Sequence, residues 1–231
     1  MIATKNQFGD GVTFNVGAYS VEVPDRARTL SGFRAWALGG EVPEKARVDF
    51  YRGKVWVEMG GEQVYSHGLL KTEFAISLGG FIKRLRLGKY WCNGILVSNL
   101  KADWSGNPDG TFVSHACRKE GRIRVIEGAR EGHTELVGSP DMVLEVVSPG
   151  SVTKDKSELR EAYWEIGIPE FWLVDARGER LDFQILKHGT KGYVETRKVG
   201  GWLKSGLFGK SFKLARDIDE VGDPEYTLEI K

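Results

Sequence analysis

The chain has 231 residues, of which 41% are hydrophobic and 28% are charged, a balance that excludes a disordered protein and allows a core of useful size. Its 33 basic and 32 acidic residues give a formal net charge of +1, so binding to a polyanion would require a local basic patch. Cys92 and Cys117 lack metal-ligand spacing, and neither a signal peptide nor a membrane-spanning apolar stretch is recognisable, so we expect a cytoplasmic protein with reduced thiols and no membrane partner.

The N-terminal part predicts an arm followed by one short helix. Residues 1–30 predict an irregular arm or an edge strand, because glycine and proline interrupt them repeatedly. A helix is predicted over residues 31–38, with Ser31 as its cap and Gly39-Gly40 as its end. The interrupting residues of the arm are Gly9, Gly11, Gly17 and Pro24.

A hairpin and a long helix follow. Residues 46–51 and 54–59 flank Arg52-Gly53, and the second run alternates apolar and polar side chains, as a half-buried strand does. Residues 66–87 carry apolar side chains at helical spacing, with basic side chains off that stripe. They predict a helix that ends at Gly88.

The middle of the chain predicts strands. One strand is expected over residues 90–98 and a short one over 111–114, directly after Pro108-Asp109-Gly110. Residues 119–125 and 135–137 predict an inserted hairpin around the polar stretch 128–132.

The apolar run 142–147 predicts a strand that is buried on both faces. A helix is expected to start at Asp155, which begins a cap-plus-acid pattern, and to stop at Gly167. An apolar strand over residues 171–174 comes next. Two C-terminal hairpins are expected, one pairing 182–186 with 193–196 and the other pairing 212–214 with 226–230.

This order of elements predicts an α/β core with flanking helices and added β-hairpins. Because no linker, repeat or low-complexity segment interrupts the chain, we expect a single domain over residues 1–231. Its parts would be an arm with a short helix at 1–45, a core at 46–186 and a C-terminal β extension at 187–231.

Glu145 is the most informative residue, because it is a charge within a strand that otherwise looks fully buried. A buried carboxylate is destabilising unless a cation, a hydrogen-bond network or a metal ion compensates it. Glu145 is therefore a structural ion-pair partner, a solvent-facing residue at a sheet edge, or part of a functional site.

Two Pro-Asp dipeptides, at 108–109 and 140–141, place an acid at the start of a predicted strand. Asp109 and Glu145 fall on separate strands that can pair side by side, and two converging carboxylates are hard ligands for Mg²⁺ or Mn²⁺. A lysine nearby would orient or deprotonate the attacking water and stabilise developing charge. Lys154 is the nearest basic candidate, and Lys156 is its competitor.

The segment from Ser139 to Leu186 resembles the central signature of a restriction-endonuclease-like family that is expanded in cyanobacteria and planctomycetes. That family is assigned to the PD-(D/E)XK nuclease superfamily. Upstream features, including the Ser66-His67 helix start and Pro108-Asp109, extend the likeness to roughly residues 47–186. The residues that match the ordered signature are Pro140, Asp141, Glu145, Val146, Ser148, Pro149, Asp155, Tyr163, Gly167, Glu170, Phe171, Trp172, Val174 and Asp175.

The resemblance implies a mixed sheet with flanking helices and Mg²⁺-dependent hydrolysis of phosphodiester bonds in DNA. By position, Asp109 and Glu145 correspond to the acids of the superfamily. The superfamily lysine lies two residues past the second acid, and in this family it comes instead from the next helix. Val147 and Leu159 occupy those two positions here, so Lys154 would have to supply the amine from the mouth of the helix.

Two further residues have open roles. Asp141 is either a third acid of the site or a strand-start residue that hydrogen-bonds backbone amides. His67 is either a satisfied inward-facing histidine or a hydrogen-bond partner of the acidic site. Glu73, on the same predicted helix, is compatible with facing either way.

The sequence contains no G-x-S-x-G, C-x-x-C, P-loop or H-E-x-x-H motif. Two functions stay open: a DNA endonuclease, and a catalytically inactive nuclease-fold module that binds DNA or a protein partner. A homodimer is expected for an endonuclease, because two-fold symmetry suits the cleavage of both strands. Phosphate contacts are expected from the inserted hairpin, at Arg118, Lys119, Arg122 and Arg124.

Overall fold

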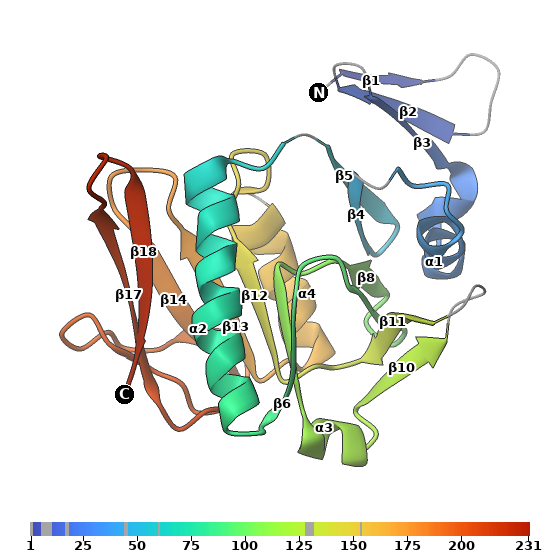
Figure 1. The fold of residues 1–231 in the computed structure, drawn as a ribbon. Coiled ribbons are helices and arrows are strands. Elements are labelled where there is room, and N and C mark those ends of the chain that lie inside the picture. The colour runs from blue at the N-terminus through green and yellow to red at the C-terminus, as the bar shows by residue number, and fades with distance from the viewer. Residues whose placement is uncertain are drawn as a thin grey trace. The chain divides into compact units, whose positions relative to one another are not determined.

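The structure is a computed structural model that describes residues 2–5, 11–16, 19–43, 46–59, 61–127, 132–152 and 154–231 (Figure 1). The expected breakers Gly9 and Gly17, and residues 128–131 of the polar stretch, lie outside the described residues. The chain divides into two compact units. The first comprises Met1–Gly61, Leu96–Asn107 and Val125–Gly138, and the second Glu62–Ile95, Pro108–Arg124 and Ser139–Lys231. The single-domain organisation stays a prediction.

The first unit begins with an antiparallel sheet of three strands, in the order β1 (Ile2–Lys5), β2 (Gly11–Val16) and β3 (Tyr19–Pro24). Of the two alternatives predicted for residues 1–30, an irregular arm or an edge strand, these segments therefore adopt the strand. In β3, Val21 and Val23 are buried and Glu22 is exposed, an alternation that favours a strand despite the nearby glycines and proline.

A 3₁₀ turn, η1 (Asp25–Arg28), leads into α1 (Leu30–Leu38). The helix ends at Gly39 as expected, but its cap is Thr29 and not Ser31. The Thr29 hydroxyl accepts a hydrogen bond from the backbone N–H of Gly32 at 3.2 Å, and this satisfies one of the free amides of the first turn.

A six-stranded sheet has the order β10-β11-β7-β8-β4-β5. The predicted hairpin is confirmed with its bounds, as β4 (Ala46–Tyr51) and β5 (Lys54–Met59). Arg34 of α1 pairs with buried Glu135 at 2.6 Å, and Ser98 donates to the same carboxylate at 2.5 Å. The remaining strands are β7 (Leu96–Asn99), β8 (Trp104–Gly106), β10 (Ile123–Glu127) and β11 (His133–Gly138).

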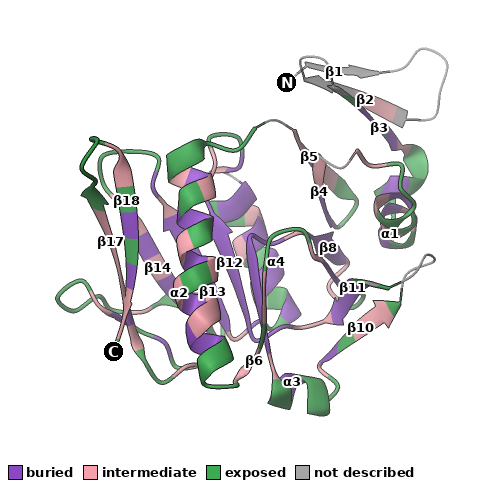
Figure 2. Cartoon of the chain, viewed as in Figure 1, coloured by how far each residue is buried: buried purple, intermediate pink, exposed green. Residues whose placement is uncertain are grey.

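The second unit is built on a mixed six-stranded sheet with the order β15-β14-β13-β12-β9-β6. Its centre is the parallel pair β12 (Met142–Val146) and β13 (Glu170–Asp175). Figure 2 shows this centre as buried, and all five residues of β12 are buried. The outer strands pair antiparallel and are β6 (Gly88–Cys92), β9 (Gly110–Ser114), β14 (Asp182–Gly189) and β15 (Gly192–Glu195).

Two helices cover opposite faces of this sheet (Figure 1). On one face, α2 (Leu70–Arg84) packs Phe74 and Leu78 into a core that includes Leu144 and Trp172. On the other, α4 (Leu159–Ile166) places Tyr163 against Phe171 of β13, with the ring centroids 5.2 Å apart. A π-helical turn precedes each helix, namely η2 (Val64–Leu69) and η3 (Lys154–Glu158). A mixed α/β fold is therefore confirmed.

The C-terminal segment forms a three-stranded antiparallel sheet of β16 (Leu203–Lys204), β17 (Ser211–Ile218) and β18 (Pro224–Ile230). Phe212 and Leu228 join the core cluster on the α2 face. The described helices include none that is long and apolar enough to cross a membrane.

Two sequence predictions fail at element boundaries. The strand expected over residues 90–98 is two strands, β6 and β7, in different sheets. Asn93 and Gly94 separate them with φ values of 67° and 76°, a left-handed conformation that ends an extended strand. Arg118 and Lys119 lie on the short helix α3 (His115–Lys119) and not on the inserted hairpin.

Candidate active site

Asp109 and Glu145 lie side by side because of how β9 and β12 pair. Gly110 of β9 is opposite Leu144 of β12 in an antiparallel register, which brings the preceding Asp109 opposite the following Glu145. Both carboxylates are buried: 3% of Asp109 and 5% of Glu145 is exposed. The backbone N–H of Val146 donates to Oδ2 of Asp109 at 2.9 Å and holds that carboxylate against the end of β12.

The two acids are close enough to interact electrostatically. Burial raises the pKa of Glu145 well above its ordinary value, and the negative charges of Asp109 and Asp155 raise it further. The positive charge of Lys154 and a hydrogen bond from Tyr163 act in the opposite direction. The site therefore concentrates negative charge that these neighbours only partly compensate.

Tyr163 holds Glu145 from the side of α4. Its hydroxyl donates to Oε1 of Glu145 at 2.5 Å, while its ring stays in the core against Phe171. Glu145 points toward this face because the alternate residues of β12, Leu144 and Val146, point into the core under α2.

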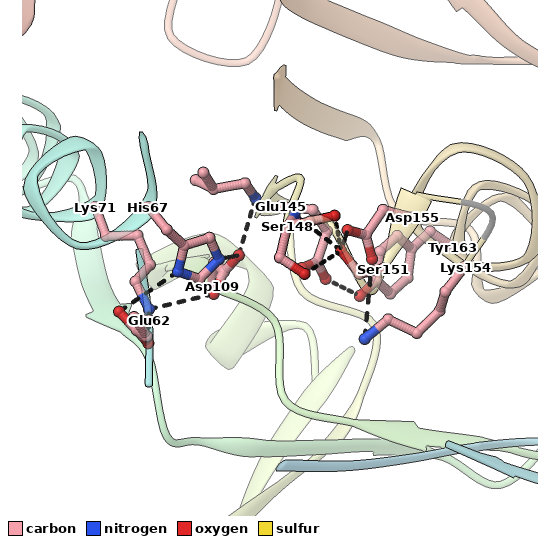
Figure 3. Close-up of polar contacts among 11 residues, drawn as sticks. Glu62, His67, Lys71, Asp109, Glu145, Ser148, Ser151, Lys154, Asp155 and Tyr163 are labelled. Atoms are coloured by element: carbon pink, nitrogen blue, oxygen red, sulfur yellow. Dashed lines mark hydrogen bonds and ion pairs between the residues drawn. The ribbon is translucent and has the colours of Figure 1, made fainter. Parts of the chain in front are cut away.

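A second cluster reaches Asp109 from η2 and α2 (Figure 3). His67 and Lys71 are four residues apart, so both lie on one face of this helical segment. Nε2 of His67 is 3.5 Å from Oδ2 of Asp109, and Nζ of Lys71 is 3.6 Å from Oδ1 of the same carboxylate. Glu62 contacts both cations, with its carboxylate 3.4 Å from Nδ1 of His67 and in an ion pair with Lys71.

His67 thus hydrogen-bonds into the acidic site, the second of the two roles left open by the sequence. Burial alone would lower the pKa of His67, but the hydrogen bond and the charge of Asp109 outweigh burial and raise that pKa above its ordinary value. The imidazole therefore gains positive character beside Asp109.

Lys154 borders the site from η3. The residue is buried, with 9% exposed, and its Nζ lies 3.8 Å from Oδ1 of Asp155. Asp155 accepts a hydrogen bond from Ser151, whose hydroxyl in turn accepts one from Ser148 at 2.9 Å. Figure 3 shows this cluster on the opposite side of the acids from His67 and Lys71. Both clusters start at π-helical turns, which are frequent at functional sites.

Three candidates lie elsewhere. Asp141 does not join the pair of acids, because its carboxylate accepts hydrogen bonds from the Ser114 N–H at 2.6 Å and from Arg122 at 2.5 Å. Lys156 is half-exposed and pairs with Asp175 at 2.7 Å. Glu73 accepts from the Leu228 N–H at 2.7 Å, so it faces the C-terminal sheet.

The donor set fits a hard divalent cation of the magnesium type. Within the part of the chain that the structure describes, no group of three or more His, Cys, Asp or Glu side chains is arranged to hold a metal by itself. Two carboxylates suffice for Mg²⁺, which keeps several waters and shares substrate phosphate oxygens. The like charges that raise the pKa of Glu145 would be neutralised by such an ion.

Sequence reasoning missed Glu62, Lys71, the electrostatic part played by Asp155 and the hydrogen bond from Tyr163 to Glu145. The spacing of His67 and Lys71 was a usable signal, because residues four apart share a helix face. For Glu62, we find no signal in the sequence.

Comparison with known proteins found one family and a similar solved structure. The Uma2 family, described as putative restriction endonucleases, matches residues 30–214. A crystal structure of a putative nuclease of the DUF820 family from Anabaena variabilis is similar, with a TM-score of 0.56 and 15% sequence identity over 78% of this chain and 90% of that one. No curated protein sequence matches the chain. The family match covers most of the chain, and the fold agrees with it, so the chain belongs to the Uma2 family of putative restriction endonucleases.

Proposed function

We propose that this protein is a Mg²⁺- or Mn²⁺-dependent endonuclease that hydrolyses phosphodiester bonds of DNA at Asp109 and Glu145. The observation that carries the proposal is the pair of buried carboxylates on adjacent strands, where burial and then the charge of Asp109 raise the pKa of Glu145. Membership of a nuclease-like family supports the reaction class.

Each side chain has a defined task in this proposal. Asp109 and Glu145 hold the cation, which when bound would polarise a phosphate oxygen and a water molecule. Tyr163 fixes the orientation of Glu145, and His67 fixes that of Asp109. These partners hold both carboxylates in place, so little reorganisation is needed when substrate arrives.

Two buried lysines are available to replace the amine missing at positions 147 and 159, where Val147 and Leu159 are buried apolar residues. We assign the role to Lys154, since its positive charge acts on Glu145 and the residue borders the acid pair from η3. Lys71 is the alternative, but it is ion-paired with Glu62 and lies 3.6 Å from Asp109. Either amine would orient the attacking water and stabilise negative charge on the phosphate.

A non-catalytic module that binds DNA or a protein partner is the second candidate function. The apolar residues Val147 and Leu159 favour it, because they stand where a nuclease of this kind carries its lysine. A homodimer and a cytoplasmic location also belong to the proposal, and they rest on the symmetry of duplex cleavage and on cysteine usage.

The test is a calorimetric titration of Mg²⁺ and Mn²⁺ into wild type and into the Asp109→Ala/Glu145→Ala variant, followed by nicking of supercoiled plasmid. We expect wild type to bind the metal and nick the plasmid, and the variant to do neither. Asp141→Asn is a matched control, since it removes a buried acid outside the pair. If wild type binds no metal at millimolar concentration, the acids are structural and the binding-module function replaces the nuclease.

A further inference from the structure

A groove lies along α2, beside the edge strand β6. Its volume is about 670 Å³. One wall is the side of α2 from Ala75 to Lys83, followed by Arg86 just after the helix. The other wall is β6 from Gly88 to Cys92, and His115 at the start of α3 lies at one end. These residues all belong to the same compact unit as the two acids.

The groove is cationic. Lys83, Arg86 and Lys89 line it and are exposed, and none of its lining residues is acidic. Within the described residues, none of these three side chains forms an ion pair. The molecule as a whole is nearly neutral, so this is a local concentration of positive charge of the kind that a polyanion requires.

One end of the groove adjoins the candidate active site. In the antiparallel pairing of β6 with β9, Cys92 is opposite Gly110, the residue that follows Asp109, and Gly88 is opposite Ser114 at the far end. The Tyr90 hydroxyl lies so close to Gly110 that a Cβ at position 110 would clash with it. Burial raises the pKa of Tyr90, and Cys92 and then Asp109 add smaller electrostatic contributions in the same direction. The groove therefore leads away from Asp109 toward α3.

Two consecutive glycines keep the groove open. Gly79 and Gly80 lie inside α2, where glycine destabilises a helix relative to alanine. A Cβ at Gly79 would be 3.4 Å from the Tyr90 ring, whereas a Cβ at Gly80 would meet nothing within 4 Å. Larger side chains at these positions would fill space that the groove now offers to a ligand.

We propose that this groove binds the sugar–phosphate backbone of one nucleic-acid strand, with phosphates against Lys83, Arg86 and Lys89, and leads that strand to Asp109 and Glu145. The choice of polymer rests on the proposed function, because an acidic peptide would satisfy the same cations. A nucleic acid is favoured, since the Cys92 end of the groove lies beside the strand whose preceding residue is Asp109, and the donor set of the acid pair suits phosphodiester chemistry.

The test measures binding of a fluorescently labelled DNA duplex by anisotropy, in EDTA, over a series of salt concentrations. We expect Lys83→Ala/Lys89→Ala to weaken binding roughly tenfold or more at low salt, and to reduce the slope of log K against log salt by about 2, since each lost phosphate contact contributes about 0.9. Arg197→Ala/Lys198→Ala removes two exposed cations outside the groove and should bind like wild type.

A second variant blocks the groove without changing charge. Gly80→Leu should weaken binding strongly and Gly80→Ala only slightly, because the open space at this position admits both side chains without disturbing the helix. The proposal would be overturned if all groove variants bound the duplex as tightly as wild type. A labelled oligoglutamate peptide that binds with the same dependence on Lys83 and Lys89, while the duplex does not bind, would overturn it as well.

The outcomes separate this proposal from the nuclease. If DNA binding in EDTA depends on the groove but wild type binds no metal, the groove proposal stands and the nuclease function is rejected. If wild type, Lys83→Ala/Lys89→Ala and Gly80→Leu nick plasmid equally, the nuclease function stands and the groove proposal is rejected.

Discussion

Two buried glutamates lie on the adjacent parallel strands β12 and β13, but they differ in how many hydrogen-bond donors surround them. Glu170 accepts hydrogen bonds from the Trp172 indole at 3.0 Å, from Ser205 at 2.7 Å, and from the backbone N–H groups of Gly206 and Leu207 at 2.6 and 3.0 Å. Within the described residues, Glu145 accepts one hydrogen bond, from Tyr163, and it faces the negative charges of Asp109 and Asp155.

In the proposed function, this difference separates a structural acid, Glu170, from a metal-binding one, Glu145. Glu170 satisfies donors of the segment before β17 and so fixes that segment against the sheet. Glu145 is held in place but poorly compensated, a state that destabilises the fold unless a cation binds. Burial alone does not distinguish the two, because 2% of Glu170 and 5% of Glu145 is exposed.

The largest expected effect concerns the amine beside Glu145. Lys154→Met should lower the rate of plasmid cleavage by roughly 10²-fold or more, because a positioned proton-transfer group contributes at least that much. Lys156→Met is the matched control, since its amine pairs with Asp175 outside the site, and it should cleave like wild type. Full activity of Lys154→Met, together with an inactive Lys71→Met, would transfer the role to Lys71.

The next effect concerns Glu170 and the stability of the fold. Glu170→Ala should lower the free energy of unfolding by roughly 3 kcal/mol or more, because it leaves several buried donors without an acceptor. Urea denaturation measures this loss, and metal affinity of the folded fraction should stay unchanged. A variant as stable as wild type would show that these hydrogen bonds are not what holds the segment.

A smaller effect of opposite sign is expected at Glu145. Without metal, Glu145→Gln should raise the free energy of unfolding by about 1–3 kcal/mol at neutral pH, since it removes a poorly compensated buried charge. The folded-state pKa of Glu145 is raised, so the wild type is penalised increasingly as the pH rises from the ordinary glutamate value, near 4.5, through the raised one.

The stability advantage of Glu145→Gln over wild type should therefore grow with pH through that window, and it should vanish below it. Urea denaturation in EDTA over a pH series measures the difference. Wild-type and variant curves that remain parallel across the window would contradict the account.

The smallest effect is expected at Tyr163. Tyr163→Phe removes the hydrogen bond to Glu145 but keeps the ring packed on Phe171. We expect metal affinity to fall roughly tenfold, as is usual when a partner of a metal ligand is lost, with little change in unfolding free energy. Calorimetry and urea denaturation check the two halves of this prediction, and unchanged metal affinity would remove Tyr163 from the site.

Much of this site could be predicted from sequence, because strand pairing is specified locally. A Pro-Asp at one strand start and a single charge in an apolar run placed Asp109 and Glu145 on neighbouring strands, and the pairing of Gly110 with Leu144 agrees with it. The helix over α2 and the hairpin of β4 with β5 were likewise predicted from their periodicities.

What could not be predicted depends on contacts between distant segments. The apolar stripe of α2 located its core face, but only packing brings Lys71 to Asp109 and Glu62 to both cations. Asp141 and Asp109 follow the same dipeptide pattern, yet Asp141 is occupied by Arg122 and the Ser114 amide. The role of a buried acid is thus decided by its donors, which lie far away in the sequence.

The most direct test of the central claim is to locate the metal. Crystals soaked in Mn²⁺ should give an anomalous difference peak between the carboxylates of Asp109 and Glu145, and crystals of Glu145→Gln should lose it. No peak at saturating Mn²⁺, or a peak at other side chains only, would contradict the claim that these two acids form the metal centre of a nuclease.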